Sequence, residues 1–132
     1  MEVLVLRLAP GEDLRLALAG ALAGRAEQAA CVLAAVGSFT QAVLRYADAG
    51  EGSEIAGPLE LLTLSGTLSL DGPHLHASVA DAQGRVIGGH VMPGCIVRTT
   101  AEVVLGLLPG WEFRRQSDTA TGYLELVPRR RG

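Results

Sequence analysis

Hydrophobic and polar positions along this chain predict mainly β-strands. Residues 59–70 alternate apolar and polar side chains after Leu62, which is the period of a half-buried strand, and Gly66 predicts a bend within it. Residues 31–36 are apolar without a break, as is typical of a strand covered on both faces. Gly37 and Ser38 interrupt this run before a second strand begins. Further strands are predicted at 3–8, 40–47, 95–108, 111–115 and 123–127.

One segment near the N-terminus has helical spacing instead. Leucine and alanine recur every three or four residues within 14–22, after the breakers Pro10 and Gly11 and the acidic pair Glu12 and Asp13. This spacing predicts an amphipathic helix over 12–26. One early helix with seven or eight strands predicts an α+β fold, a compact single domain with a mainly antiparallel sheet. We expect the domain to span residues 1–128 and a basic C-terminal tail to span 129–132.

Composition adds an expectation about assembly. Of the 132 residues, 48% are hydrophobic but only 4% are aromatic, so the core must be aliphatic. This surplus of apolar residues in a small domain indicates burial between subunits. The net charge of −3 argues against autonomous binding to nucleic acid, whose affinity depends on neutralising phosphates.

Two further observations concern the compartment. Cys31 and Cys95 are far apart and lack metal-ligand spacing, so Cys31 is predicted to be a buried, reduced thiol. The chain begins directly with a strand-like pattern, and no apolar stretch reaches ~18 residues. We therefore expect a cytoplasmic protein without a membrane span.

All three histidines lie in one predicted β-hairpin. His74 and His76 share a strand face because side chains alternate, and His90 is on the returning strand. The sequence of 81–84, Asp-Ala-Gln-Gly, is typical of a type I turn followed by a glycine bulge. That turn sets His76 opposite His90 on one face, whereas a two-residue loop would place His90 on the other face.

Three imidazoles on one face predict a divalent metal site. Neutral imidazole suits zinc, nickel, copper or iron, and three ligands leave a position open for water or a small-molecule ligand. No carboxylate is placed in the hairpin as a general base, and Glu60 and Glu102 could reach it only through the fold. The alternative is that the histidines line a polar strand face or a subunit contact.

The chain also resembles a known family, the plants-and-prokaryotes-conserved (PPC) domain, from Val3 to about Leu126. The motifs that carry the resemblance are Gly37-Ser38, Ala42 to Tyr46, Gly57 to Gly66, His74 to His76, Gly84 to His90 and Thr100 to Gly106. The resemblance implies a compact α+β domain, a homotrimer, and a metal such as zinc held by His74, His76 and His90.

The family also suggests a role with DNA, because its plant members carry an Arg-Gly-Arg-Pro minor-groove hook before the domain. This chain lacks that core, and Arg129 to Gly132 is its nearest approach. Three hypotheses therefore stay open: a metal or small-molecule site, a DNA-associated regulatory protein, and a structural oligomerisation module in which Arg45, Glu60 or Glu102 form ion pairs across subunits. No nucleophile, phosphate loop or paired-carboxylate signature supports catalysis.

Overall fold

Eight strands and one short helix form the structure, a computed structural model that describes residues 1–132. The elements are β1 (Glu2–Leu8), α1 (Leu14–Ala19), β2 (Ala30–Arg45), β3 (Ser53–Ser69), β4 (Gly72–Ala80), β5 (Val86–Val91), β6 (Ile96–Leu107), β7 (Trp111–Ser117) and β8 (Leu124–Arg130). The predicted mainly antiparallel sheet is confirmed, but the fold is mostly β rather than α+β.

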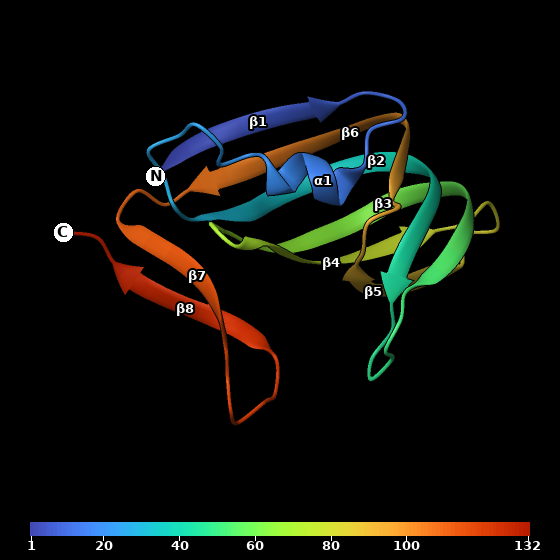
Figure 1. Cartoon of the computed structure of the whole chain (residues 1–132). Helices are drawn as coiled ribbons and strands as arrows, with labels where there is room; N and C mark the ends of the chain where they lie inside the picture. The colour runs from blue at the N-terminus through green and yellow to red at the C-terminus, as the bar shows by residue number, and fades with distance from the viewer.

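Six strands form one antiparallel sheet in the order β1-β6-β2-β3-β4-β5 (Figure 1). The C-terminal end of β2 also pairs with β5, where Leu44 lies opposite Val91 and Arg45 opposite His90. This additional pairing curls the sheet so that β2, β3, β4 and β5 close on one another. It brings β5, the last strand of the sheet order, back to β2 and places Arg45 beside the histidine hairpin.

Strand β2 is longer than the sequence predicted because Gly37 and Ser38 do not interrupt it. A Cβ at Gly37 would lie 2.8 Å from the Cα of Ala101 on β6, so this glycine allows two backbones to approach closely. The register shifts between Phe39 and Gln41 against both neighbouring strands, and against β6 it shifts also between Val32 and Ala34 and between Gly37 and Phe39.

The helix is much shorter than the predicted range of 12–26. It begins at its N-cap Asp13, whose side chain accepts a hydrogen bond of 3.0 Å from the backbone N–H of Leu16, and it ends at Gly20. Residues 21–24 continue only as turns, and Gly24 has a φ of +72°. The prediction failed because glycines at 20 and 24 disfavour helix, while the apolar spacing continued past them.

The core is aliphatic, as the composition predicted. It is one cluster of 22 buried residues in which Phe39 is the single aromatic side chain, and Leu14 and Leu18 of α1 belong to it. Both cysteines are free thiols; Cys95 is buried, whereas Cys31, which the sequence predicted to be buried, is only half-buried.

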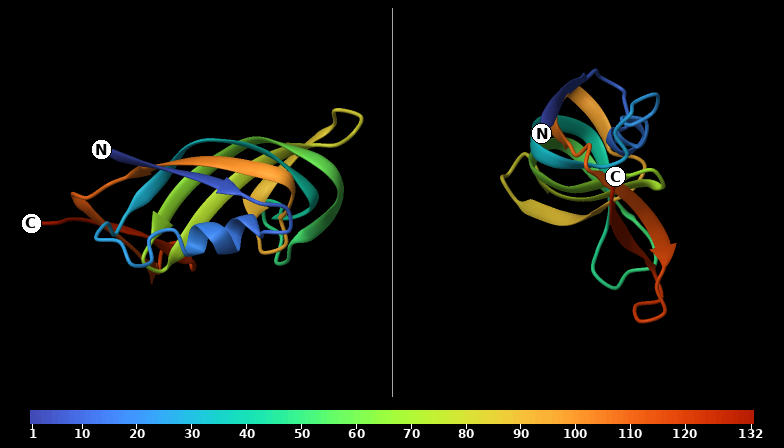
Figure 2. Two further views of the ribbon diagram at one scale, coloured as in Figure 1. Left: turned by 90° about the horizontal axis from the view of Figure 1, so that it is seen from above. Right: turned by 90° about the vertical axis from the view of Figure 1, so that its left-hand side faces the viewer.

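Strands β7 and β8 form a separate hairpin that extends from the six-stranded sheet (Figures 1 and 2). Phe113 at its base is buried; its backbone N–H donates a hydrogen bond to the Gln28 carbonyl, and its carbonyl accepts one from the Leu70 N–H. Strand β8 runs to Arg130, so two arginines expected in a C-terminal tail lie in a strand, where the Arg130 guanidinium stacks 5.0 Å from the Trp111 ring. No helix of the chain has the length and apolar character needed to cross a membrane.

Candidate metal centre

The turn between β4 and β5 sets the register of the histidine hairpin. The Asp81 carboxylate accepts hydrogen bonds of 2.9 Å from the backbone N–H groups of Gln83 and Arg85, and Gly84 has a φ of +77°. The backbone N–H of Asp81 donates to the Arg85 carbonyl at 2.9 Å. This is the predicted three-residue loop with a glycine in the left-handed region, and it pairs His76 with His90 and Ala77 with Gly89 as expected.

The three imidazoles converge on one point. The ring centroids lie 5.1 Å apart for His74 and His76, 5.2 Å for His74 and His90, and 5.8 Å for His76 and His90. One nitrogen from each ring lies within 4.8 Å of the others. His74 and His90 are half-buried and His76 is exposed, so the cluster opens to solvent on one side.

Backbone pairing across four strands places polar side chains in a row through the cluster. Arg45 of β2 lies opposite His90, and His76 lies opposite Ser65 of β3. Residues paired across strands share a face, so Arg45, His90, His76 and Ser65 line one surface. The sequence named Arg45 as a residue of unknown role, and the structure brings it to the cluster through the β2–β5 pairing.

Two glycines, one on β3 and one on β5, let the backbone of the histidine hairpin approach the backbones of β3 and β2 closely. Gly66 on β3 has a φ of +146°, and a Cβ there would collide with the carbonyl oxygen of His74. A Cβ at Gly89 would lie 2.8 Å from the carbonyl oxygen of Arg45. The glycine beside His90 thus makes room for strand β2.

The surroundings of the cluster favour neutral imidazoles. Burial is the largest cause that lowers the pKa of His90 to about 4, and the charges of Arg45 and Arg15 add to it. Burial also lowers the pKa of His74, assisted by the charge of Arg115 and opposed by Glu125. Neutral imidazole is the form that binds metal ions, so these shifts fit a metal centre.

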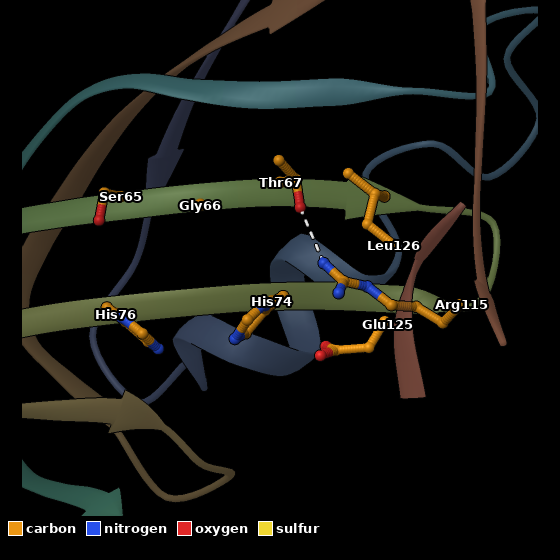
Figure 3. A pocket seen from close by; sticks show the side chains of 8 residues that line it. All are labelled: Ser65, Gly66, Thr67, His74, His76, Arg115, Glu125 and Leu126. Carbon is orange, nitrogen blue, oxygen red and sulfur yellow. Dashed lines mark hydrogen bonds between the residues drawn. The ribbon is translucent and has the colours of Figure 1, made fainter. Parts of the chain in front are cut away.

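A cleft of about 380 Å³ adjoins His74 and His76 (Figure 3). Its remaining lining residues are Ser65, Gly66, Thr67, Arg115, Glu125 and Leu126. Arg115 and Glu125 belong to β7 and β8, and Figure 3 shows the Glu125 side chain extending toward His74 and the Arg115 side chain extending toward Thr67. The β7–β8 hairpin therefore supplies one wall of the site.

Sequence reasoning missed Arg115 and Glu125. It predicted their strands, but not that the hairpin docks beside β3 and β4, and no local motif indicates that docking. Glu60 and Glu102, the two carboxylates that it named, do not line the histidine cleft. Glu60 lines a smaller cleft of about 120 Å³ that Arg98 also lines, and Glu102 is exposed on β6 opposite Arg7.

The donor set fits a transition metal such as zinc. Three imidazole nitrogens are a common protein ligand set for zinc, and they leave a coordination position free. Fold and site together define a small, mostly β domain with a histidine cluster at the end of a curled antiparallel sheet.

Comparison with known families identifies the family of this domain. Residues 1–109 match the family model of the Plants and Prokaryotes Conserved (PCC) domain, also abbreviated PPC, and the chain belongs to this family. The matched region includes all three histidines. It ends before the β7–β8 hairpin, which carries Arg115 and Glu125.

Two curated relatives are longer proteins. The chain is 52% and 50% identical over 126 residues to proteins named bifunctional protein GlmU from two Synechococcus strains, JA-3-3Ab and JA-2-3B'a(2-13). The match covers 96% of this chain but only 20% of each relative. The chain thus spans about a fifth of the length of these curated relatives.

Solved structures show the same fold over nearly the whole chain. A hypothetical protein from Salmonella enterica is 41% identical with a TM-score of 0.94, over 98% of this chain and 94% of that one. A metal-containing protein from Archaeoglobus fulgidus is 30% identical with a TM-score of 0.82, over 96% and 94%. In both cases the similarity includes the β7–β8 hairpin, since the covered share exceeds residues 1–109.

Proposed function

We propose that this chain is a metal-binding PPC domain in which His74, His76 and His90 hold a divalent ion, with zinc as the expected metal. The observation that carries the proposal is that one nitrogen of each ring lies within 4.8 Å of the other two. The solved relative from Archaeoglobus fulgidus, described as metal-containing, supports it. When bound, zinc would supply Lewis acidity and an open position for water or a small ligand.

We also propose that the domain assembles as a homotrimer. Val5 of β1 and Val36 of β2 are 67% and 55% exposed, and Leu62 of β3 is 46% exposed. Backbone pairing puts Val5 opposite Val104 and Val36 opposite Glu102 on β6, so Val5 and Val36 share the outer face of the sheet. An exposed apolar face of this kind supports burial against further copies of the chain.

The DNA-associated alternative finds less support in the structure. Two of the C-terminal arginines lie in β8, and the side chain of Arg131 donates hydrogen bonds to the carbonyls of Ala26 and Pro109. These arginines are therefore partly engaged within the domain, and the net charge is −3. Salt-dependent binding to AT-rich DNA near physiological ionic strength would favour this alternative instead.

Metal analysis of protein purified without chelator tests the metal centre. We expect one divalent ion per chain in the wild type and a large loss of bound metal in His76→Ala, because only two imidazole ligands remain. The exposed position of His76 makes this substitution safe for folding. Ser65→Ala, which removes a polar neighbour directly opposite His76, serves as the matched control and should keep the metal. Equal metal content in the wild type and His76→Ala would contradict the site and favour the purely structural module.

A further inference from the structure

We propose that the cleft beside the three histidines binds a small carboxylate, which Arg115 holds next to the metal position. This inference rests on the proposed metal centre, because the carboxylate would serve as the anionic partner of the ion. It goes further by naming the class of ligand and the residue that selects it. That residue lies outside the region that defines the family match.

Arg115 has the geometry of a receptor for an oxyanion. Its Nη2 donates a hydrogen bond of 3.0 Å to the Thr67 hydroxyl, which fixes the guanidinium at the cleft wall. Its Nη1 forms no hydrogen bond within the chain and, unlike Nε, is not a buried atom, so it stays open to a ligand in the cleft. No carboxylate lies within 4.0 Å of the guanidinium. A carboxylate accepts well from a free guanidinium donor because the two planar groups match.

The charges around the cluster also call for an anion. The positive charge of Arg115 lowers the pKa of His74, and the charges of Arg45 and Arg15 lower the pKa of His90. None of these arginines forms a salt bridge within the chain. Glu125 is the acidic side chain whose charge raises the pKa of His74. A divalent ion would add two positive charges to this excess, so an anionic ligand and the metal should strengthen each other's binding.

The charge of the cleft favours a small carboxylate over a phosphate. Its volume of about 380 Å³ is near the lower end for small-molecule pockets and has room for either anion. The Glu125 carboxylate lines the same cleft and repels a second negative charge more strongly than a single one. A monoanion satisfies Arg115 with less repulsion than the phosphate dianion.

The experiment measures zinc binding to chelator-stripped protein by calorimetry near neutral pH. Chloride, acetate and inorganic phosphate are compared at equal ionic strength in the wild type, Arg115→Gln and Arg7→Gln. Arg7→Gln is the matched control because it removes an equal charge from an exposed position on β1, at the opposite end of the sheet order. Each anion binds some zinc in solution and so lowers the free zinc concentration by the same amount for every variant. Differences between variants therefore report the effect of the anion on the protein's own zinc site.

We expect acetate to raise the zinc affinity of the wild type and of Arg7→Gln by about fivefold or more, and to have no such effect in Arg115→Gln. No acetate effect in a wild type that binds zinc, or an equal effect in Arg115→Gln, would overturn the carboxylate site. A larger effect of phosphate than of acetate would overturn the choice of carboxylate as ligand class.

A second measurement separates this inference from the metal centre. Acetate is titrated into metal-free protein while NMR follows the Arg115 Nε–H and the Thr67 amide. Shifts in these two signals support the carboxylate site even if the wild type binds no zinc, an outcome that would overturn only the metal centre. Absent shifts together with absent zinc binding would overturn both.

A conservative variant guards against loss of folding in Arg115→Gln. Arg115→Lys keeps the positive charge but lacks the planar fork of donors. We expect it to fold and to lose most of the acetate effect while its zinc affinity in chloride stays close to that of the wild type. An unchanged acetate effect in Arg115→Lys would show that charge alone, and not the guanidinium of Arg115, recruits the anion.

Discussion

At the scale of single residues, the position of His74 depends on a glycine in the neighbouring strand. Gly66 on β3 lies opposite Leu75, and its φ of +146° brings the backbone against the His74 carbonyl. Any side chain at position 66 would push against the strand that carries two of the three histidines.

We therefore expect Gly66→Ala to lower the free energy of unfolding by about 2 kcal/mol or more, through backbone strain and the collision with His74. Zinc affinity should fall with it. Gly72→Ala is the matched control, since Gly72 also has a positive φ, +113°, but a Cβ there meets nothing within 4 Å. Chemical denaturation compares the two variants. Equal losses of stability would mean that strain alone matters and that the close approach to His74 does not.

The low pKa of His90 gives a residue-scale prediction about pH. Folding lowers this pKa from 6.5 to about 4, so the unfolded chain binds a proton in that range and the folded chain does not. The metal-free protein should therefore lose stability as the pH falls from 6.5 toward 4.

His90→Gln removes this contribution, and its stability should change less with pH than that of the wild type. Denaturation of both proteins between pH 6.5 and roughly 5, above the range in which most carboxyl groups titrate, measures the difference. Parallel pH profiles would show that His90 is protonated as readily in the folded as in the unfolded state.

At the scale of elements, one aspartate anchors the β7–β8 hairpin to the sheet. The Asp71 carboxylate, in the β3–β4 turn, accepts hydrogen bonds from the backbone N–H of Arg115 at 2.9 Å and from the Arg114 guanidinium at 3.3 Å. The first of these bonds is the main cause that lowers the Asp71 pKa. The carboxylate therefore stays charged in mild acid, and the anchor weakens only as the pH falls through this lowered pKa.

Asp71→Ala should loosen the hairpin without unfolding the sheet, because Asp71 is exposed and the core does not include it. We expect the Arg115 amide to exchange its hydrogen several-fold faster in this variant, while the amides of β2 and β6 keep their protection. Asp118→Ala is the control, since Asp118 caps only the distal turn of the same hairpin, where it accepts from Ala120 and Thr121. Unchanged exchange at Arg115 in Asp71→Ala would show that Asp71 does not anchor the hairpin and that its other contacts, such as those of Phe113 and the bond from Arg115 to Thr67, hold it.

At the scale of the whole molecule, we expect the outer face of the sheet to control the proposed assembly. We expect the wild type to have three times the 13.7 kDa mass of one chain in solution. Val36→Asp should dissociate the trimer because it places a second negative charge opposite Glu102 on that apolar face. Light scattering after size exclusion measures the mass.

Leu16→Asp is the control for assembly, since Leu16 is 63% exposed on α1, whose Leu14 and Leu18 pack into the core and not on the outer face of the sheet. It should leave the mass unchanged. A wild type with the mass of a single chain would contradict the trimer, as would a trimer that survives Val36→Asp.

Local hydrogen bonds explain why the histidine hairpin was predictable from the sequence. Asp81 and Gly84 fix a turn through contacts within four residues, and the period of a strand then decides which side chains share a face. The aliphatic core follows from the same alternation of apolar positions. Apolar spacing alone was misleading at the helix, because it does not register the backbone cost of glycine at positions 20 and 24.

The sequence by itself therefore determined the strands, the turn and the histidine cluster, because each depends on interactions between near neighbours in the chain. Only the tertiary structure decided what surrounds that cluster. Arg45 reaches His90 because β2 curls onto β5, and Arg115 reaches Thr67 because a hairpin outside the family match docks beside β3 and β4. These contacts join residues more than 40 positions apart, and they arise from sheet closure and packing that no local pattern encodes.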